Sequence, residues 1–307
     1  MRVAAIDCGT NTLLLLIADV GPDGARAIEE QAEIVRLGEG LDATGALKPE
    51  AIARARAVLA RFVDRIRARS CAHVLAVGTE ALRRAQNGHL FVNDATALLG
   101  TVGGRFVVID GEREARLSFR AVSASFPRLR GARTVLDIGG GSTELLVGER
   151  AIEELVSLPI GSVRLTERLL RHDPPTDEER AALRATVDAA LDQAPAPRGT
   201  LVGIAGTVTT LAAMSQGLSV YDGERVHGSE LSYDSLVETV ERLGRTPLAD
   251  RLRTPGLAPG RADVIYAGAV ILERVLARAG ADRCLVSDRG VRWGLIYEAA
   301  GLGNLDE

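Results

Sequence analysis

The chain has 307 residues, of which 46% are hydrophobic and 25% are charged, and its formal net charge is −4. This composition is that of an ordinary globular protein with one large or two medium domains, and the lack of net basic charge argues against non-specific nucleic-acid binding. The three cysteines form no metal-binding or disulfide pattern, and no apolar stretch is as long as a membrane span, so we expect a cytoplasmic protein.

The sequence opens with a predicted β-hairpin. Residues 2–6 and 13–20 are apolar strands around a loop of small and hydroxyl-bearing residues, and residues 27–37 are expected to add a third strand. Beyond them, helices alternate with strands: helices at 49–68, 91–99 and 112–123, and strands at 74–77 and 106–109. This alternation indicates an α/β domain whose sheet is mostly parallel behind the hairpin.

After a polar segment at residues 126–131, the opening pattern returns. Residues 134–136 and 144–147 are predicted strands around a second small-residue loop. Further strands are predicted at 200–204 and 284–286, and helices at 176–192, 208–215, 262–278 and 291–299. We therefore expect two duplicated α/β domains, residues 1–125 and 126–307, with a cleft between them. The terminal helix, about residues 291–305, is a candidate to pack back on the first domain.

The two hairpin loops, Asp7-Cys8-Gly9-Thr10-Asn11-Thr12 and Asp137-Ile138-Gly139-Gly140-Gly141-Ser142-Thr143, carry residue types that suit a phosphate site. Glycines let the backbone approach an anion and present its N–H groups, and the hydroxyls are further donors. Asp7 and Asp137 would repel a phosphate unless a cation lay between, so the pattern predicts Mg²⁺, with Glu144 as a further direct or water-mediated ligand. One such loop is equally consistent with a tight turn, whereas two strengthen the phosphate interpretation.

Three other segments suit the same chemistry. Gly206-Thr207 lies between a strand and a helix, where N–H groups face a positive helix end. Arg83 follows a strand by about one helical turn and can reach toward phosphates. Glu112 and Glu114 occupy the first turn of a helix. Each also has an ordinary structural interpretation: a turn, a solvated arginine, and acids that favour a helix dipole.

Taken in order, these motifs resemble those of the exopolyphosphatase / guanosine-pentaphosphate phosphohydrolase (Ppx/GppA) family over nearly the whole chain. They occupy residues 5–12, 78–83, 110–117, 136–145 and 206–207. The resemblance implies two actin-like domains of the ribonuclease H-like type, as in the actin–Hsp70–sugar-kinase superfamily, in the short form without extra C-terminal domains. It also implies a homodimer.

The resemblance assigns roles residue by residue. Glu114 matches the catalytic glutamate and Arg83 the motif arginine. The metal ligands would be Asp7, Asp137 and Glu144. Substrate would be bound by Arg83 and by Thr10, Asn11, Thr12, Gly139, Gly140, Gly141, Ser142, Thr143, Gly206 and Thr207.

Two positions depart from the family pattern, because Arg113 stands where a second Glu is usual and Asp110 where a Ser is usual. Arg113 would either contact phosphate or point to solvent. In both cases the catalytic role rests on Glu114, with Glu112 a less favoured substitute.

The expected activity is Mg²⁺- (or Mn²⁺-) dependent hydrolysis of the terminal phosphoanhydride of inorganic polyphosphate, which releases orthophosphate. Hydrolysis of guanosine pentaphosphate would use the same bond and the same residues. Two alternatives stay open: a non-catalytic phosphate or alarmone sensor, which Arg113 allows, and an ATP-dependent kinase of the same superfamily.

Overall fold

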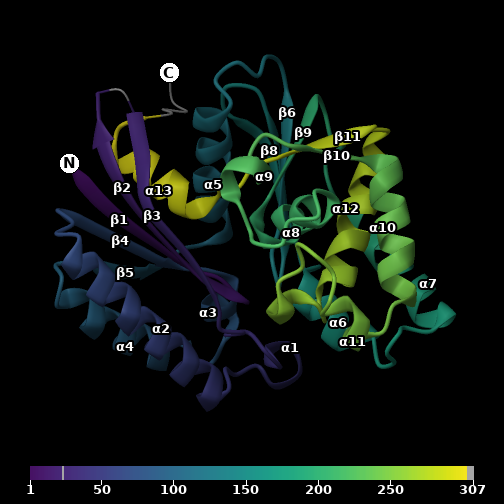
Figure 1. The fold of residues 1–307 in the computed structure, drawn as a ribbon, viewed down its shortest axis with the longest axis horizontal. Helices are drawn as coiled ribbons and strands as arrows, with labels where there is room; N and C mark the ends of the chain where they lie inside the picture. The colour runs from purple at the N-terminus through teal and green to yellow at the C-terminus, as the bar shows by residue number, and fades with distance from the viewer. Residues whose placement is uncertain (23, 303–307) are drawn as a thin grey trace. The chain divides into compact units, whose positions relative to one another are not determined.

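A computed structural model describes residues 1–22 and 24–302, and the chain divides into two units (Figure 1). Unit 1 contains Met1–Ala124 and the chain from Gly290 onward, and unit 2 contains Ser125–Arg289. Within the described residues, no helix combines the length and the apolar character needed to cross a lipid bilayer.

Unit 1 is built on a five-stranded sheet in the order β3-β2-β1-β4-β5. The strands are β1 (Arg2–Cys8), β2 (Thr12–Gly21), β3 (Gly24–Ile34), β4 (His73–Gly78) and β5 (Arg105–Val108). β1, β2 and β3 pair antiparallel, while β4 and β5 run parallel to β1. The predicted hairpin followed by a parallel sheet is therefore confirmed.

Helices cover both faces of this sheet. Alternate residues of β1 point to opposite faces, so Ala4 and Ile6 pack with α2 (Pro49–Ala68) and α4 (Gly88–Gly100). Val3 and Ala5 pack instead with α5 (Gly111–Ser125) and α13 (Val291–Ala299). The short helices α1 (Leu41–Thr44) and α3 (Glu80–Arg84) lie in connections.

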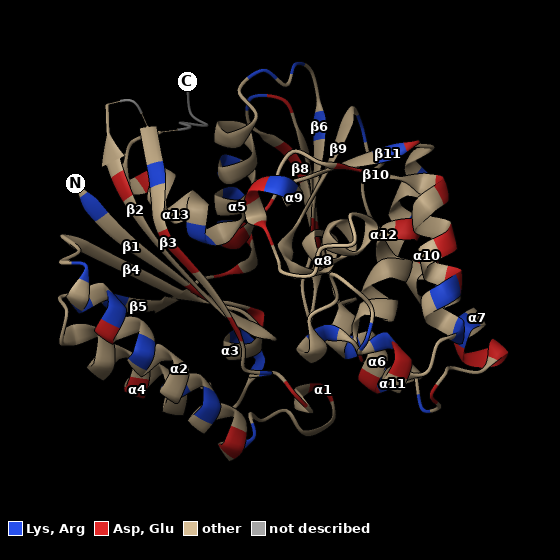
Figure 2. Ribbon diagram, in the orientation of Figure 1, with Lys and Arg blue, Asp and Glu red and all other residues tan. Residues whose placement is uncertain are grey.

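The predicted bounds of the 49–68 helix agree with α2. Pro49 opens it, where a missing N–H does no harm, and Val58, Phe62 and Ile66 form its buried stripe. The helix carries several basic positions (Figure 2). One of them, Arg65, pairs with Glu29 of β3 at 2.7 Å.

Unit 2 repeats the plan of unit 1. Its sheet has the order β10-β11-β9-β6-β7-β8, and the run β8-β7-β6-β9-β11 reproduces β3-β2-β1-β4-β5 with the same strand directions. The strands are β6 (Arg133–Ile138), β7 (Thr143–Gly148), β8 (Ile152–Leu158), β9 (Thr200–Ile204), β10 (Glu230–Ser232) and β11 (Arg283–Val286). The prediction of duplicated α/β domains is confirmed by this order.

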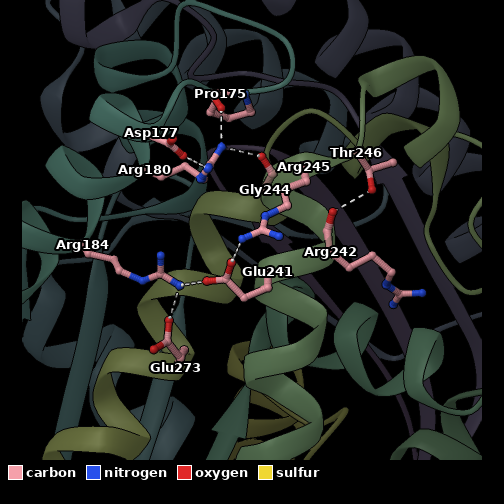
Figure 3. A network of polar contacts seen from close by, with 10 residues as sticks. All are labelled: Pro175, Asp177, Arg180, Arg184, Glu241, Arg242, Gly244, Arg245, Thr246 and Glu273. Carbon is pink, nitrogen blue, oxygen red and sulfur yellow. Dashed lines mark hydrogen bonds and ion pairs between the residues drawn. The ribbon is translucent and has the colours of Figure 1, made fainter.

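The largest core of unit 2 lies under its helices. These are α6 (Ser162–Leu169), α7 (Asp177–Leu191), α8 (Ala205–Ser215), α9 (Gly223–Val226), α10 (Tyr233–Arg245), α11 (Leu248–Arg251), η1 (Pro259–Arg261) and α12 (Ile265–Ala279). A polar network links three of them, because Arg184 of α7 donates to Glu241 of α10 at 2.9 Å and to Glu273 of α12 at 3.4 Å (Figure 3). β8, α6 and α10 were not predicted.

Candidate functional site

The two hairpin loops, residues 9–12 (loop 1) and 139–142 (loop 2), have the same turn. In loop 1 the N–H of Gly9 donates to the carbonyl of Thr12 at 3.0 Å, and in loop 2 the N–H of Gly139 donates to the carbonyl of Ser142 at 2.9 Å. The sequence repeat is therefore also a repeat of backbone geometry.

In each unit, the segment after the third strand braces the loop through the loop's carbonyl groups. Val35 and Arg36 donate to the carbonyl of Asn11, both at 2.9 Å. In unit 2, Ser162 donates to the carbonyl of Gly139 at 3.0 Å and Val163 to that of Gly140 at 2.9 Å. The N–H groups of Gly140 and Gly141 have no backbone acceptor among residues 1–22 and 24–302. Neighbouring N–H groups of this kind form anion-binding nests.

The loop hydroxyls donate to protein acceptors. Thr10 donates to Glu80 at 3.2 Å, Ser142 to Glu144 at 2.7 Å, and the fully buried Thr143 to the carbonyl of Ile160 at 2.6 Å. A hydroxyl has one proton to donate, so these hydroxyls offer a ligand lone pairs rather than protons in this arrangement. The backbone N–H groups are therefore the stronger candidates to bind a phosphate.

Asp7 at the end of β1 and Asn11 of loop 1 each have a buried polar atom that lacks a partner. Asp7 Oδ1 and Asn11 Nδ2 make no hydrogen bond in the described part of the chain. Buried polar atoms rarely lack a partner, so an acceptor and a donor left this way point to a cation and an anion that they would bind. Burial raises the pKa of Asp7 to about 6, and the positive charge of Arg292 acts in the opposite direction.

Strands β6 and β7 place Asp137 directly opposite Glu144, so both side chains lie on one face of the sheet. Both are buried. Neighbouring carboxylates and hydroxyls are hard oxygen ligands of the kind that Mg²⁺ prefers. No cluster of three or more His, Cys, Asp or Glu is present within residues 1–22 and 24–302. Asp137 and Glu144 form a pair in unit 2, and Asp7 belongs to unit 1.

The two predicted catalytic residues of unit 1 lie together. Arg83 Nη1, from α3, donates to Glu114 Oε2, from α5, at 2.7 Å and to the carbonyl of Ile109 at 2.8 Å. Their side chains are 23% and 12% exposed, so the pair is largely shielded from water. The guanidinium is held by a backbone carbonyl and in turn fixes one oxygen of the glutamate.

The residues around Glu114 have other partners. Arg113 pairs with Glu298 of α13, so it neither points to solvent alone nor is left for a phosphate. Glu112 is exposed and pairs with Arg116 one turn along α5 at 2.7 Å. Glu114 is thus set apart from the other acid of its turn by burial and by Arg83.

The predicted Gly206-Thr207 site begins helix α8. Ala205 has a φ of 66°, a left-handed conformation, and Gly206 and Thr207 follow in the first turn of the helix, where backbone N–H groups have no partner within the helix. The guanidinium of Arg261 covers Gly206, because a Cβ at residue 206 would lie 2.0 Å from Arg261 Nη1. A side chain at this position would displace the arginine.

Sequence reasoning missed Arg261 and Glu80. Arg261 precedes α12 in a Pro-Gly turn, and no spacing links it to residue 206. Glu80 lies within the 78–83 motif, but the sequence alone did not predict a role for it. It is buried, accepts from Thr10 and from Arg84 at 3.1 Å, and burial raises its pKa while Arg84 lowers it.

Comparison with known proteins supports the motif resemblance. A model of the Ppx/GppA phosphatase family matches residues 16–302. Exopolyphosphatase 2 of Mycobacterium tuberculosis is 40% identical to this chain over 315 residues, which cover 98% of this chain and 99% of that protein.

Solved structures agree over the same extent. The crystal structure of the Aquifex aeolicus member of the Ppx/GppA family has a TM-score of 0.83 to this chain at 35% identity, with 98% of each chain covered. An exopolyphosphatase from Cytophaga hutchinsonii has a TM-score of 0.87 at 28% identity, with 100% of each covered. The predictions of two actin-like domains and of a phosphatase are confirmed by these full-length matches, and the chain belongs to the Ppx/GppA phosphatase family.

Proposed function

We propose that this chain is an exopolyphosphatase, which removes the terminal phosphate of inorganic polyphosphate as orthophosphate. The observation that carries the proposal is the shielded Arg83–Glu114 pair at 2.7 Å, since it provides a fixed carboxylate in a chain that also has two phosphate-type loops. The name of the 40%-identical relative, exopolyphosphatase 2, supports the choice of substrate.

The residues proposed to bind a divalent cation, Mg²⁺ or Mn²⁺, are Asp7, Asp137 and Glu144. The partnerless Oδ1 of Asp7 supports this assignment. When bound, the ion supplies charge neutralisation for the phosphate oxygens.

The chain's own groups would do the rest. Backbone N–H groups of loop 2 and of Gly206 and Thr207 bind phosphate oxygens, and Asn11 Nδ2 adds a side-chain donor. Glu114 accepts a proton from a water molecule whose oxygen attacks the terminal phosphorus, while the bond from that phosphorus to the bridging oxygen breaks. The bridging oxygen leaves with the shortened chain. Arg83 orients Glu114, and its remaining N–H groups offset charge on the transferred phosphoryl group.

Replacing the proposed base tests the reaction. Glu114→Gln keeps the size of the side chain but removes the carboxylate, so we expect phosphate release from polyphosphate to fall by about 10²- to 10⁴-fold. Binding of polyphosphate should be largely retained. Glu112→Gln is the matched control, because it changes an exposed acid in the same helical turn and should leave turnover near that of wild type. Near-wild-type turnover of Glu114→Gln would exclude the proposed role of Glu114.

The substrate is tested by parallel phosphate-release assays on long polyphosphate, guanosine pentaphosphate and ATP. An exopolyphosphatase releases phosphate from polyphosphate with the highest kcat/KM. A higher kcat/KM for guanosine pentaphosphate would indicate a guanosine-pentaphosphate phosphohydrolase instead. Acceptor-dependent ATP turnover would indicate a kinase, and binding without turnover of any of the three would indicate a sensor.

A further inference from the structure

A row of residues crosses the sheet of unit 2 beside loop 2. Asp137 on β6 lies opposite Glu144 on β7, and Glu144 lies opposite Ser157 on β8. Residues directly opposite each other in antiparallel strands present their side chains on the same face. The three side chains are therefore neighbours along one line, two strand spacings from end to end.

Glu144 is bonded from two sides within this arrangement. Its Oε1 accepts a hydrogen bond from Ser142 at 2.7 Å and another from Ser157 at 2.7 Å. The glutamate is 2% exposed and Ser142 is buried, whereas Ser157 is exposed and reaches the glutamate from the solvent side. Two hydrogen bonds to one oxygen fix the orientation of the Glu144 carboxyl group, which lies directly opposite Asp137 on the same face of the sheet.

The corresponding row of unit 1 lacks these groups. Asp7 lies opposite Leu14, and Leu14 lies opposite Ala32. Ser157 thus occupies the register position of an alanine in a sheet of the same topology, and its hydroxyl acts on a glutamate that unit 1 does not have. The sheet itself needs no hydroxyl there.

We propose that Ser157 is a positioning residue for Glu144: together with Ser142, it holds the carboxyl group of Glu144 in one orientation for a divalent cation. This inference rests on the proposed metal role of Glu144. It adds a residue that lies outside every motif of the sequence.

The test measures binding of Mg²⁺ alone to the full chain by titration calorimetry. Ser157→Ala should weaken Mg²⁺ binding by about 10- to 100-fold, the range found when outer-shell partners of metal ligands are removed. Ser157→Thr keeps a hydroxyl on a β-compatible side chain and should restore most of the affinity. In phosphate-release assays, Ser157→Ala should require more Mg²⁺ but approach the wild-type kcat when Mg²⁺ saturates.

Ser229→Ala is the matched control, because that serine also makes a 2.7 Å hydrogen bond in unit 2, to the carbonyl of Val226. It should leave Mg²⁺ binding unchanged, and thermal unfolding of each variant checks that the fold is intact. The inference is overturned if Ser157→Ala binds Mg²⁺ like wild type while Glu144→Gln does not, or if Ser157→Thr restores nothing. If Glu144→Gln also binds like wild type, the metal role of Glu144 fails as well, and the hydrolysis assays still judge the proposed function separately.

Discussion

The loop 1 and loop 2 hairpins share one turn, yet their neighbouring side chains differ. In unit 1 the row beside Asp7 continues with Leu14 and Ala32, and in unit 2 the row beside Asp137 continues with Glu144 and Ser157. Asp7 accordingly has an oxygen without a partner, whereas Glu144 receives two hydroxyl donors. The two units therefore share the loop backbone, whereas the carboxylate and hydroxyl row beside loop 2 has apolar residues in its place beside loop 1.

The strand-to-helix turns that follow β4 and β9 differ in a second way. After β4, Thr79 keeps a φ of −116° and the chain leads to Arg83, which holds Glu114. After β9, Ala205 turns to a φ of 66° and the helix begins at once, with Arg261 over Gly206. One turn therefore leads to a candidate base, and the other presents N–H groups for an anion.

The largest loss of activity is expected when Glu144 of unit 2 is replaced by leucine, the residue at the matching position of unit 1, Leu14. Glu144→Leu removes a proposed metal ligand, so kcat/KM for polyphosphate should fall by at least about 100-fold. Leu14→Met is the control at the matching position of unit 1 and should change kcat/KM little. If both variants keep wild-type kcat/KM, the difference between the rows has no catalytic meaning.

The isolation of Asp7 predicts a gain of stability when its charge is removed. Its pKa in the fold is about 6, above the ordinary value of 3.8, so the folded state binds the proton more tightly than the unfolded state does. Stability is therefore lost as pH rises from about 4 to 6, and in metal-free buffer above pH 6 Asp7→Asn should be more stable by roughly 1–3 kcal/mol. The two proteins should be equally stable near pH 4. Urea unfolding with a chelator at both pH values measures this.

Asp19 is a control for which removal of the charge should have the opposite effect on stability. A hydrogen bond from Arg2 lowers the pKa of Asp19, so its charge stabilises the fold at neutral pH. Asp19→Asn should lower stability there, and this loss should shrink as pH falls below the ordinary aspartate pKa and vanish below the lowered pKa of the folded state. An Asp7→Asn variant that behaved like Asp19→Asn would show that Asp7 has a partner.

A side chain at Gly206 should weaken phosphate binding. In Gly206→Ala the new Cβ would meet the guanidinium of Arg261, which must then move away from the N–H groups of α8. Loss of one charge-assisted hydrogen bond corresponds to about a tenfold rise in KM for polyphosphate. Gly100→Ala is the control, since a Cβ there meets no atom within 4 Å. Steady-state kinetics that give an unchanged KM for Gly206→Ala would show that Arg261 does not contribute to substrate binding.

The smallest effect concerns the turn after β9. Ala205 holds a left-handed conformation that glycine adopts without strain, so Ala205→Gly should raise the unfolding free energy by up to about 1 kcal/mol. Thr79→Gly at the matching turn of unit 1 should lower it, because Thr79 is buried, has a negative φ and donates to the carbonyl of Cys8. Chemical denaturation of both variants makes the comparison.

The repeated hairpin and the helix at 49–68 could be predicted because their signals are local. β8 was missed since three of its seven residues, Glu153, Glu154 and Ser157, are polar and exposed, as suits a strand at the edge of a sheet. α10 carried a usable signal: Leu236, Val240 and Leu243 recur at helical spacing behind the capping residue Ser232. The sequence of β8 therefore lacks a clear strand pattern, whereas that of α10 contains a clear helical pattern.

The candidate site divides in the same way. Residues within one motif, such as Asp137 and Glu144, follow from the hairpin pattern. The partners that orient them come from distant segments, as with Ser157 for Glu144 and Glu298 for Arg113. These pairings depend on strand register and helix packing, which spacing along the chain does not reveal.

The assignment of α13 to unit 1 has a consequence for the order in which the protein forms. Residues 125–289 are synthesised between the sheet of unit 1 and the helix that covers one of its faces. On the ribosome, unit 2 is therefore complete before Val3, Ala5 and Leu16 receive Trp293 and Ile296 as neighbours. Until α13 is translated, α5 is the helix available to cover this face of the unit 1 sheet, and the part that α13 would cover is an apolar surface of the kind that favours aggregation of incomplete chains.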